Sequence, residues 1–210
     1  MARQHGITTE TAKRLLVDAG AIYINYGEDN ERLLGATNDG NSFVIEQDIR
    51  EVEVDGARGP VKGLRRIIEV RAQIVANLLE MTADNLQLAL AGSTKADYPD
   101  DGTKEYDSIT RKTAIGEDAY IDNVALVGEI SGSKKPVICM VKNALSDEGL
   151  SIETVDKDEA GLQITFTGHF DPADLDDEPW EIRFPVIEEE NGNGNESGNG
   201  NGNESGNGGD

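Results

Sequence analysis

Residues 66–78 carry the strongest periodic pattern in the chain. One set of alternate positions is apolar, comprising Ile68, Val70, Ala72, Ile74, Ala76 and Leu78. The positions between them hold Ile67, Glu69, Arg71, Gln73, Val75 and Asn77. Successive side chains of a β-strand point to opposite faces of its sheet. The pattern therefore predicts a long strand with one face packed on an apolar core and the other face wetted or against a polar partner.

Shorter strand-like segments follow one another through the rest of the chain. The sequence predicts further strands at residues 21–26, 43–54, 121–130, 136–142, 150–155, 162–168 and 180–184. Within residues 43–54 the apolar positions change parity, which predicts a bulge near Arg50 and Glu51. Residues 150–155 and 162–168 are expected to form a hairpin, because residues 156–161 between them are polar and end in glycine.

Helical signals are few and local. Thr8 or Thr9 is expected to cap a short N-terminal helix that runs to Asp18 and is closed by Gly20. Thr82 is expected to cap a second helix that ends before Gly92. Residues 55–63 are rich in glycine and are predicted to be a loop, and residues 92–120 are polar and predicted to be a long irregular loop. Many short strands with so few helices indicate a mainly β fold, a β-sandwich or barrel with one flanking α-helix.

The C-terminal segment differs in composition from everything before it. The sequence NGNGNESG at residues 191–198 is repeated without change at residues 199–206. A segment dominated by glycine and asparagine cannot bury a core that would offset the entropy of ordering it. The sequence therefore predicts one β domain at residues 1–187 and a flexible acidic tail at residues 188–210.

The net charge of the chain excludes some classes of binding partner. The formal net charge is −22, with 41 acidic against 19 Lys and Arg residues. Such a surface repels the phosphate backbone of nucleic acids and the anionic leaflet of membranes. We therefore expect neither ordinary nucleic-acid binding nor membrane binding. The N-terminal residues lack the apolar segment of a signal peptide, so we expect a protein that is made and assembled in a cytoplasm.

No residue pattern predicts catalysis, and we expect no enzyme, no catalytic residue, no cofactor and no metal site. Cys139 lies in an apolar run, where an inert buried thiol is expected, and His5 and His169 fit no zinc spacing. Residues 97–102 and 171–178 are dense in carboxylates but lack the spacing of a calcium loop. Two alternatives stay open: a soluble acidic β-sandwich binding module with calcium as its candidate ligand, and a small hydrolase built from scattered carboxylates.

The order of these features resembles that of the major tail tube proteins of long-tailed, siphovirus-like phages. The resemblance covers roughly residues 7–184. It rests on GAIYINY at 20–26, LGATNDGNSF at 34–43, VDGARGPVKG at 54–63, the long strand, the helix at 82–91 and LQITFTGHFD at 162–171. It implies a compact β-sandwich whose subunits form hexameric rings, with the inner sheets joined into one barrel and the rings stacked into a hollow tube.

The resemblance also implies a mechanical function in the tail of a virion. The partners would be further copies of the chain, a tape-measure protein, and the tail terminator and tail tip proteins, while DNA would pass through the lumen without specific binding. The candidate lumen-facing residues are Glu69, Arg71, Gln73 and Asn77. A negative wall would keep DNA from sticking, and joining sheets between subunits would cover their open edges. Residues 55–63 and 92–120 are the candidates for contacts between rings.

Overall fold

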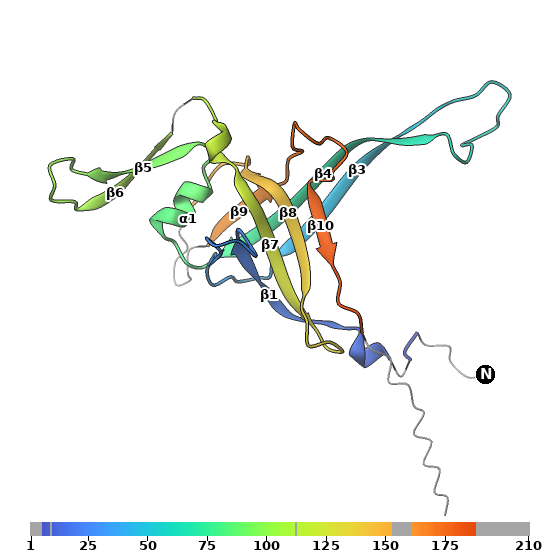
Figure 1. The fold of residues 1–210 in the computed structure, drawn as a ribbon, viewed down its shortest axis with the longest axis horizontal. Coiled ribbons are helices and arrows are strands. Elements are labelled where there is room, and N and C mark those ends of the chain that lie inside the picture. The colour runs from blue at the N-terminus through green and yellow to red at the C-terminus, as the bar shows by residue number, and fades with distance from the viewer. Residues whose placement is uncertain (1–5, 9, 112, 153–160, 188–210) are drawn as a thin grey trace, which may run out of the picture.

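The computed structural model describes residues 6–8, 10–111, 113–152 and 161–187. Figure 1 shows a β-rich body from which two hairpins project, one formed by β3 and β4 and the other by β5 and β6. The strands are β1 (Leu16–Ile24), β2 (Arg32–Leu33), β3 (Ser42–Glu51), β4 (Arg65–Leu78), β5 (Ser93–Tyr98), β6 (Tyr106–Arg111), β7 (Ile121–Ile130), β8 (Val137–Ser146), β9 (Leu162–Thr167) and β10 (Trp180–Arg183). The helices are α1 (Ala83–Leu88) and two 3₁₀ turns, η1 (Thr11–Lys13) and η2 (Glu117–Ala119). The predicted tail at residues 188–210 lies outside the described residues.

The described part of the chain is mainly β, with one large antiparallel sheet and one short α-helix, as the sequence predicts. The strand order is β2-β1-β7-β8-β9-β4-β3, and β10 pairs with β8. The sheet folds over on itself, in a way that is consistent with a β-sandwich. Its enclosed core consists of Ile22, Ile24, Leu34, Ala72, Ile74, Ala76, Leu78, Ala89, Val124, Val141, Ala144, Leu162, Ile164 and Phe166.

Strand β8 is the corner at which the sheet folds. One edge of β8 pairs with β7. On its other edge, Ile138–Val141 pair with β10, whereas Leu145 and Ser146 pair with β9. Between the two partners Asn143 has a φ of 45°, in the left-handed region. This local reversal lets a single strand serve both layers of the fold.

The predicted long strand is confirmed, but only its second half packs on the core. Strand β4 begins one residue before the predicted start, at Arg65, and its apolar positions from Ala72 to Leu78 are fully buried. Ile68 is 64% exposed, because that half of β4 leaves the body together with β3. A local pattern shows that a strand has two faces, but it does not show how far the partner layer extends.

The bulge predicted near Arg50 and Glu51 lies elsewhere. Asp48 pairs with Glu69, and the next residue, Ile49, pairs with Ile67. Ile68 is therefore the extra residue, and it belongs to β4 rather than to β3. The change of parity in one strand reports a shift in pairing, but it does not identify which strand of the pair carries the additional residue.

The predicted N-terminal helix from Thr8 or Thr9 to Asp18 is wrong. Only the 3₁₀ turn η1 forms, and β1 has already begun at Leu16. Gly20 is not a helix cap. It has a φ of 72° and lies where the pairing of β1 with β7 shifts register, between Val17 and Ala21. Pairing with a distant strand overrides the local helix signal here.

The helix at Thr82 is confirmed, and the long loop predicted after it is wrong. The Thr82 hydroxyl accepts a hydrogen bond from the backbone N–H of Asn85 at 3.1 Å. Residues 92–120 contain the hairpin β5–β6. Its alternation is hidden in the sequence because nearly every side chain of the hairpin is exposed, so neither parity needs to be apolar.

The predicted hairpin between residues 150–155 and 162–168 is also not formed as expected. Residues 150–152 are not strand, and residues 153–160 lie outside the described residues. Strand β9 pairs instead with β4 and β8. Trp180–Arg183 forms the predicted last strand, β10.

Candidate assembly surfaces

The sheet formed by β9, β4 and β3 has one apolar and one polar face. The apolar face carries Ile74, Phe166 and their neighbours into the core. The opposite face, here called the acidic face, comprises Ser42, Val44, Glu46 and Asp48 of β3, Glu69, Arg71, Gln73, Val75 and Asn77 of β4, and Gln163, Thr165 and Thr167 of β9. These residues are brought together by cross-strand register, so they form one continuous surface over three strands.

Hydrogen bonds between side chains join the strands across the acidic face. Gln73 Nε2 donates to Thr167 Oγ1 at 3.1 Å, and Gln163 Nε2 donates to Asn77 Oδ1 at 2.8 Å. Thr167 Oγ1 in turn donates to Asp147 at 3.0 Å. Because these amides and hydroxyls have partners, they are held in fixed positions, with Thr167 itself buried.

The charge of this surface is net negative. Asp147 and Glu148 follow β8, and their carboxylates accept the hydroxyl hydrogens of Thr167 and Thr165. Together with Glu46, Asp48 and Glu69, they place five exposed carboxylates on the face, against the guanidinium of Arg71 and those of Arg50 and Arg66, which pair across the same face farther along the arm strands. The net charge of the face is therefore −2, the difference between five carboxylates and three guanidinium groups.

All four predicted lumen-facing residues lie on the acidic face, in two different settings. Gln73 and Asn77 lie over the body and take part in the hydrogen bonds described above. Glu69 and Arg71 lie on the projecting part of β4, where the Arg71 guanidinium is 3.9 Å from the Glu69 carboxylate. The exposed pair contributes little to stability.

Sequence reasoning missed the contributions of β3, β9 and the end of β8. The alternation of Leu162, Ile164 and Phe166 implied that Gln163, Thr165 and Thr167 share a face. No local signal could show that this face continues the polar face of β4, because the two strands are far apart in the sequence.

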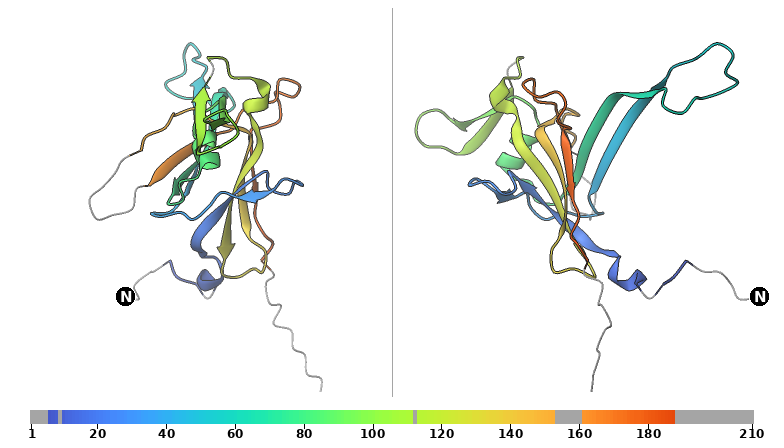
Figure 2. Two further views of the ribbon diagram at one scale, coloured as in Figure 1. Left: turned by 90° about the vertical axis from the view of Figure 1, so that its left-hand side faces the viewer. Right: turned by 45° about the vertical axis from the view of Figure 1, so that its right-hand side comes forward.

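The projecting part of the β3–β4 hairpin, residues 46–71, is here called the arm. Figure 2 shows it leaving the body and ending in an open loop. It carries exposed apolar side chains at Val52, Val54, Ile67 and Ile68, and Arg65 forms an ion pair with Glu51 across the two strands. Exposed apolar side chains gathered on a projection are typical of surfaces that contact another protein.

The second projection is the β5–β6 hairpin, residues 93–111, here called the finger. Tyr98 and Tyr106 are direct cross-strand partners, with ring centroids 6.5 Å apart. Lys104 Nζ bridges Asp97 at 2.8 Å and Asp107 at 2.9 Å, and the hydrogen bonds to these two carboxylates raise the pKa of Lys104. The ring contact and the two ion pairs thus stabilise the tip of the finger, although the finger has no apolar core of its own.

The two ends of the large sheet have open strand edges. Within the described residues, β3 pairs with β4 alone, and β2 touches only the last two residues of β1. An unpaired edge presents backbone N–H and C=O groups that another strand can pair with. Natural proteins usually cover or blunt such edges, so an open edge at each end is suited to strand pairing between copies.

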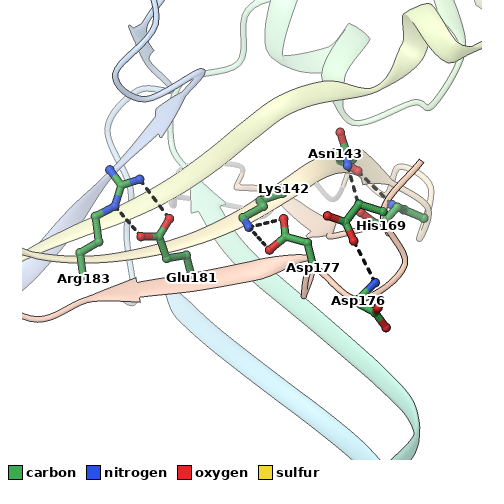
Figure 3. A network of polar contacts seen from close by, with 8 residues as sticks. Lys142, Asn143, His169, Asp176, Asp177, Glu181 and Arg183 are labelled. Atoms are coloured by element: carbon green, nitrogen blue, oxygen red, sulfur yellow. Dashed lines mark hydrogen bonds and ion pairs between the residues drawn. The ribbon is translucent and has the colours of Figure 1, made fainter. Parts of the chain in front are cut away.

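The second acidic segment, residues 171–178, lies in the connection from β9 to β10. Figure 3 shows Asp177 held by Lys142 Nζ at 2.7 Å and Glu181 held by Arg183 Nε at 2.8 Å. The hydrogen bond from Arg183 lowers the pKa of Glu181. Asp171 accepts a hydrogen bond from the backbone N–H of Ala173 at 2.8 Å, so part of this acidic segment is engaged in local turns.

The candidate reactive side chains occupy ordinary structural positions. Cys139 is half-buried in β8, and burial raises the pKa of its thiol. His169 follows β9 and stacks edge-on against Tyr120, with ring centroids 5.2 Å apart. Over residues 6–8, 10–111, 113–152 and 161–187, no group of three or more His, Cys, Asp or Glu side chains is placed to hold a metal ion.

None of the helices in the described part of the chain has the length and hydropathy that crossing a bilayer requires. A scan against protein-family models found no match, and a search of curated proteins found no relative.

Proposed function

We propose that this chain is the structural subunit of a phage-type tail tube, which assembles into rings that stack around a channel for viral DNA. The observation that carries the proposal is the two-faced sheet. One face of β9, β4 and β3 closes the core, while the other presents a continuous acidic surface of hydrogen-bonded polar groups. Antiparallel sheets commonly have one core face and one solvated face, so the net negative charge of the solvated face is what supports a channel wall.

The acidic face has the chemistry that a DNA conduit requires. Double-stranded DNA is densely negative, and a protein binds it by neutralising phosphates with Lys and Arg. A wall with net charge −2 in every subunit does the reverse, because it repels the phosphates. DNA would therefore pass along the channel without being held at any point.

The open edges and the two projections supply the contacts that assembly needs. Pairing β3 of one copy with an edge strand of the next would continue the sheet around a ring and cover both open edges. The arm and the finger leave the body and present exposed apolar and aromatic side chains, as expected for elements that reach a neighbouring subunit. The number of copies in a ring, six by the resemblance, follows from the angle at which neighbours meet.

The virion tail, with assembly in the host cytoplasm, is the location that this function implies. The tape-measure, tail terminator and tail tip proteins are its proposed partners besides further copies of the chain.

Sedimentation over a wide range of protein concentrations, combined with negative-stain electron microscopy of the concentrated samples, tests the proposal. The expected result is a concentration-dependent shift from monomers to rings or tubes with a stain-filled centre. A protein that sediments as a monomer at every concentration and forms no rings or tubes would overturn the proposal.

A further inference from the structure

The tip of the finger combines exposed aromatic rings with negative charge. Tyr98 is 60% exposed and Tyr106 is 65% exposed, although each ring lies beside the other. Five carboxylates surround them, from Asp97, Asp100, Asp101, Glu105 and Asp107, against the ammonium of Lys104. The net charge of the tip is therefore −4. Tyrosines on a projecting, internally tied hairpin are the kind of residue that dominates binding energy at protein interfaces.

A groove at another end of the molecule has the opposite character. It lies between the β7–β8 turn and the chain that leaves β10, has a volume of about 1030 Å³, and is lined in part by Lys134, Lys135, Arg183, Phe184 and Val186. Phe184 is 61% exposed and Val186 is 89% exposed. This groove is here called the basic socket.

The cations of the basic socket are available to an external partner. Among the described residues, neither Lys134 nor Lys135 forms an ion pair through its side chain, whereas Arg183 is held by Glu181. Lys134 and Lys135 are adjacent on an exposed turn in a chain whose net charge is −22. Two unpaired cations beside exposed apolar side chains form a surface that favours an acidic, aromatic partner.

We infer that the finger of one copy docks into the basic socket of the next copy, with Tyr98 and Tyr106 against Phe184 and Val186 and the acidic tip against Lys134 and Lys135. This inference rests on the proposed self-assembly and names one of its contacts. Figure 1 shows the finger projecting beside α1, while the β7–β8 turn lies at the far end of the body, so one chain cannot fill its own socket.

The contact is of the head-to-tail kind, because two different surfaces meet. Such contacts repeat indefinitely along a filament or close into a ring, and they do not end at a dimer. Complementary charge would guide the encounter and suppress wrong pairings, and the buried aromatic and apolar side chains would stabilise the contact once formed.

Charge reversal on both sides of the contact tests the inference. One variant carries Lys134→Glu and Lys135→Glu. The other carries Asp100→Lys and Glu105→Lys, which leaves the Asp97–Lys104–Asp107 bridge of the finger intact. A third variant combines all four changes and so keeps the net charge of −22. Circular dichroism and urea midpoints equal to those of the unchanged protein establish that each variant folds.

Each double variant alone should need at least about a tenfold higher concentration to assemble, because like charges then face each other. An equimolar mixture of the two double variants should assemble, since the basic finger of one fits the acidic socket of the other. The fourfold variant should assemble alone. The finger variant has its net charge reduced from −22 to −18, so its impairment cannot arise from greater general repulsion, and recovery in the mixture cannot arise from misfolding.

Three results would overturn the inference. If the unchanged protein assembles and both double variants assemble as well as it does, the proposed function stands and the contact is wrong. The same conclusion follows if neither the mixture nor the fourfold variant recovers. The first of these results is also the one expected if Glu188–Glu190 of the same chain occupied the socket, because the double lysine change would then leave assembly unimpaired. An unchanged protein that never assembles would overturn both proposals.

Discussion

Asn143 and His169 hold each other at the corner where β8 passes from one layer of the fold to the other. Asn143 Nδ2 donates to the backbone oxygen of His169 at 3.2 Å, and His169 Nδ1 lies 3.1 Å from the backbone oxygen of Asn143. A carbonyl oxygen only accepts, so Nδ1 carries the proton in this contact. The backbone N–H of His169 also donates to the oxygen of Lys142 at 3.0 Å, which ties the end of β9 to the corner (Figure 3).

Replacing Asn143 tests the corner. Asn143→Ala removes the side-chain hydrogen bond and places alanine at a φ of 45°, where its Cβ is strained. Asn143→Gly removes the same hydrogen bond without the strain. We expect the alanine variant to be less stable than the glycine variant by about 1 kcal/mol in urea unfolding. Equal stability of the two variants would mean that the left-handed backbone does not constrain this corner.

Gly168 is predicted to tolerate no side chain. A Cβ at this position would lie 2.5 Å from the backbone oxygen of Pro179, so the chain entering β10 would have to move. Gly168→Ala should lower the free energy of unfolding by about 3 kcal/mol. Gly161→Ala is the matched control, because a Cβ there meets nothing closer than 3.8 Å. A Gly168 variant as stable as the Gly161 variant would show that the contact between Gly168 and the chain entering β10 is loose.

Removing residues 188–210 should leave folding and assembly intact. This segment lies outside the described residues, and its Gly/Asn repeats offer no apolar surface to pack. The urea midpoint and the assembly concentration of the shortened chain should match those of the full chain. A shortened chain that no longer folds would refute the division into a domain and a tail.

Glu69→Lys tests the wall of the channel. The change replaces one exposed carboxylate of the acidic face, and its ion pair with Arg71 is too exposed to matter for folding. Virions with this change should assemble normally and eject DNA slowly, since a cation repeated in every subunit attracts passing phosphates. The defect should ease as salt rises, because ions screen the attraction.

Glu28→Lys provides the control for this experiment, since Glu28 is exposed in the connection from β1 to β2 and is not part of the acidic face. It makes the same charge change away from the acidic face, so we expect the rate of DNA ejection to be unaffected. Equal ejection by the two variants at low salt would place Glu69 outside the channel. Loss of assembly in the Glu69 variant would instead place this residue in a contact between subunits.

The sequence predicted those elements whose signal is local. The alternation in β4 and the Thr82 cap both depend on neighbouring residues, and both are present in the structure. The N-terminal helix was predicted wrongly because pairing of β1 with β7 joins residues about a hundred positions apart, such as Ile22 and Leu126, and this pairing outweighs a weak helix signal.

The candidate site could be predicted only in part for the same reason. Glu69, Arg71, Gln73 and Asn77 were found because they alternate along one strand. Gln163 and Thr167 complete the acidic face through pairing of β9 with β4, which no local pattern encodes. The finger was missed because its strands are exposed on both faces, and without burial there is no apolar period to read.

A cryo-electron microscopy reconstruction of the assembled protein tests the central claim most directly. The account predicts a hollow tube of stacked rings in which β3, β4 and β9 line the channel and the side chains of Glu69, Gln73 and Asn77 point into it. Assemblies without a channel, or tubes in which this sheet turns its acidic face to the outside, would contradict the account.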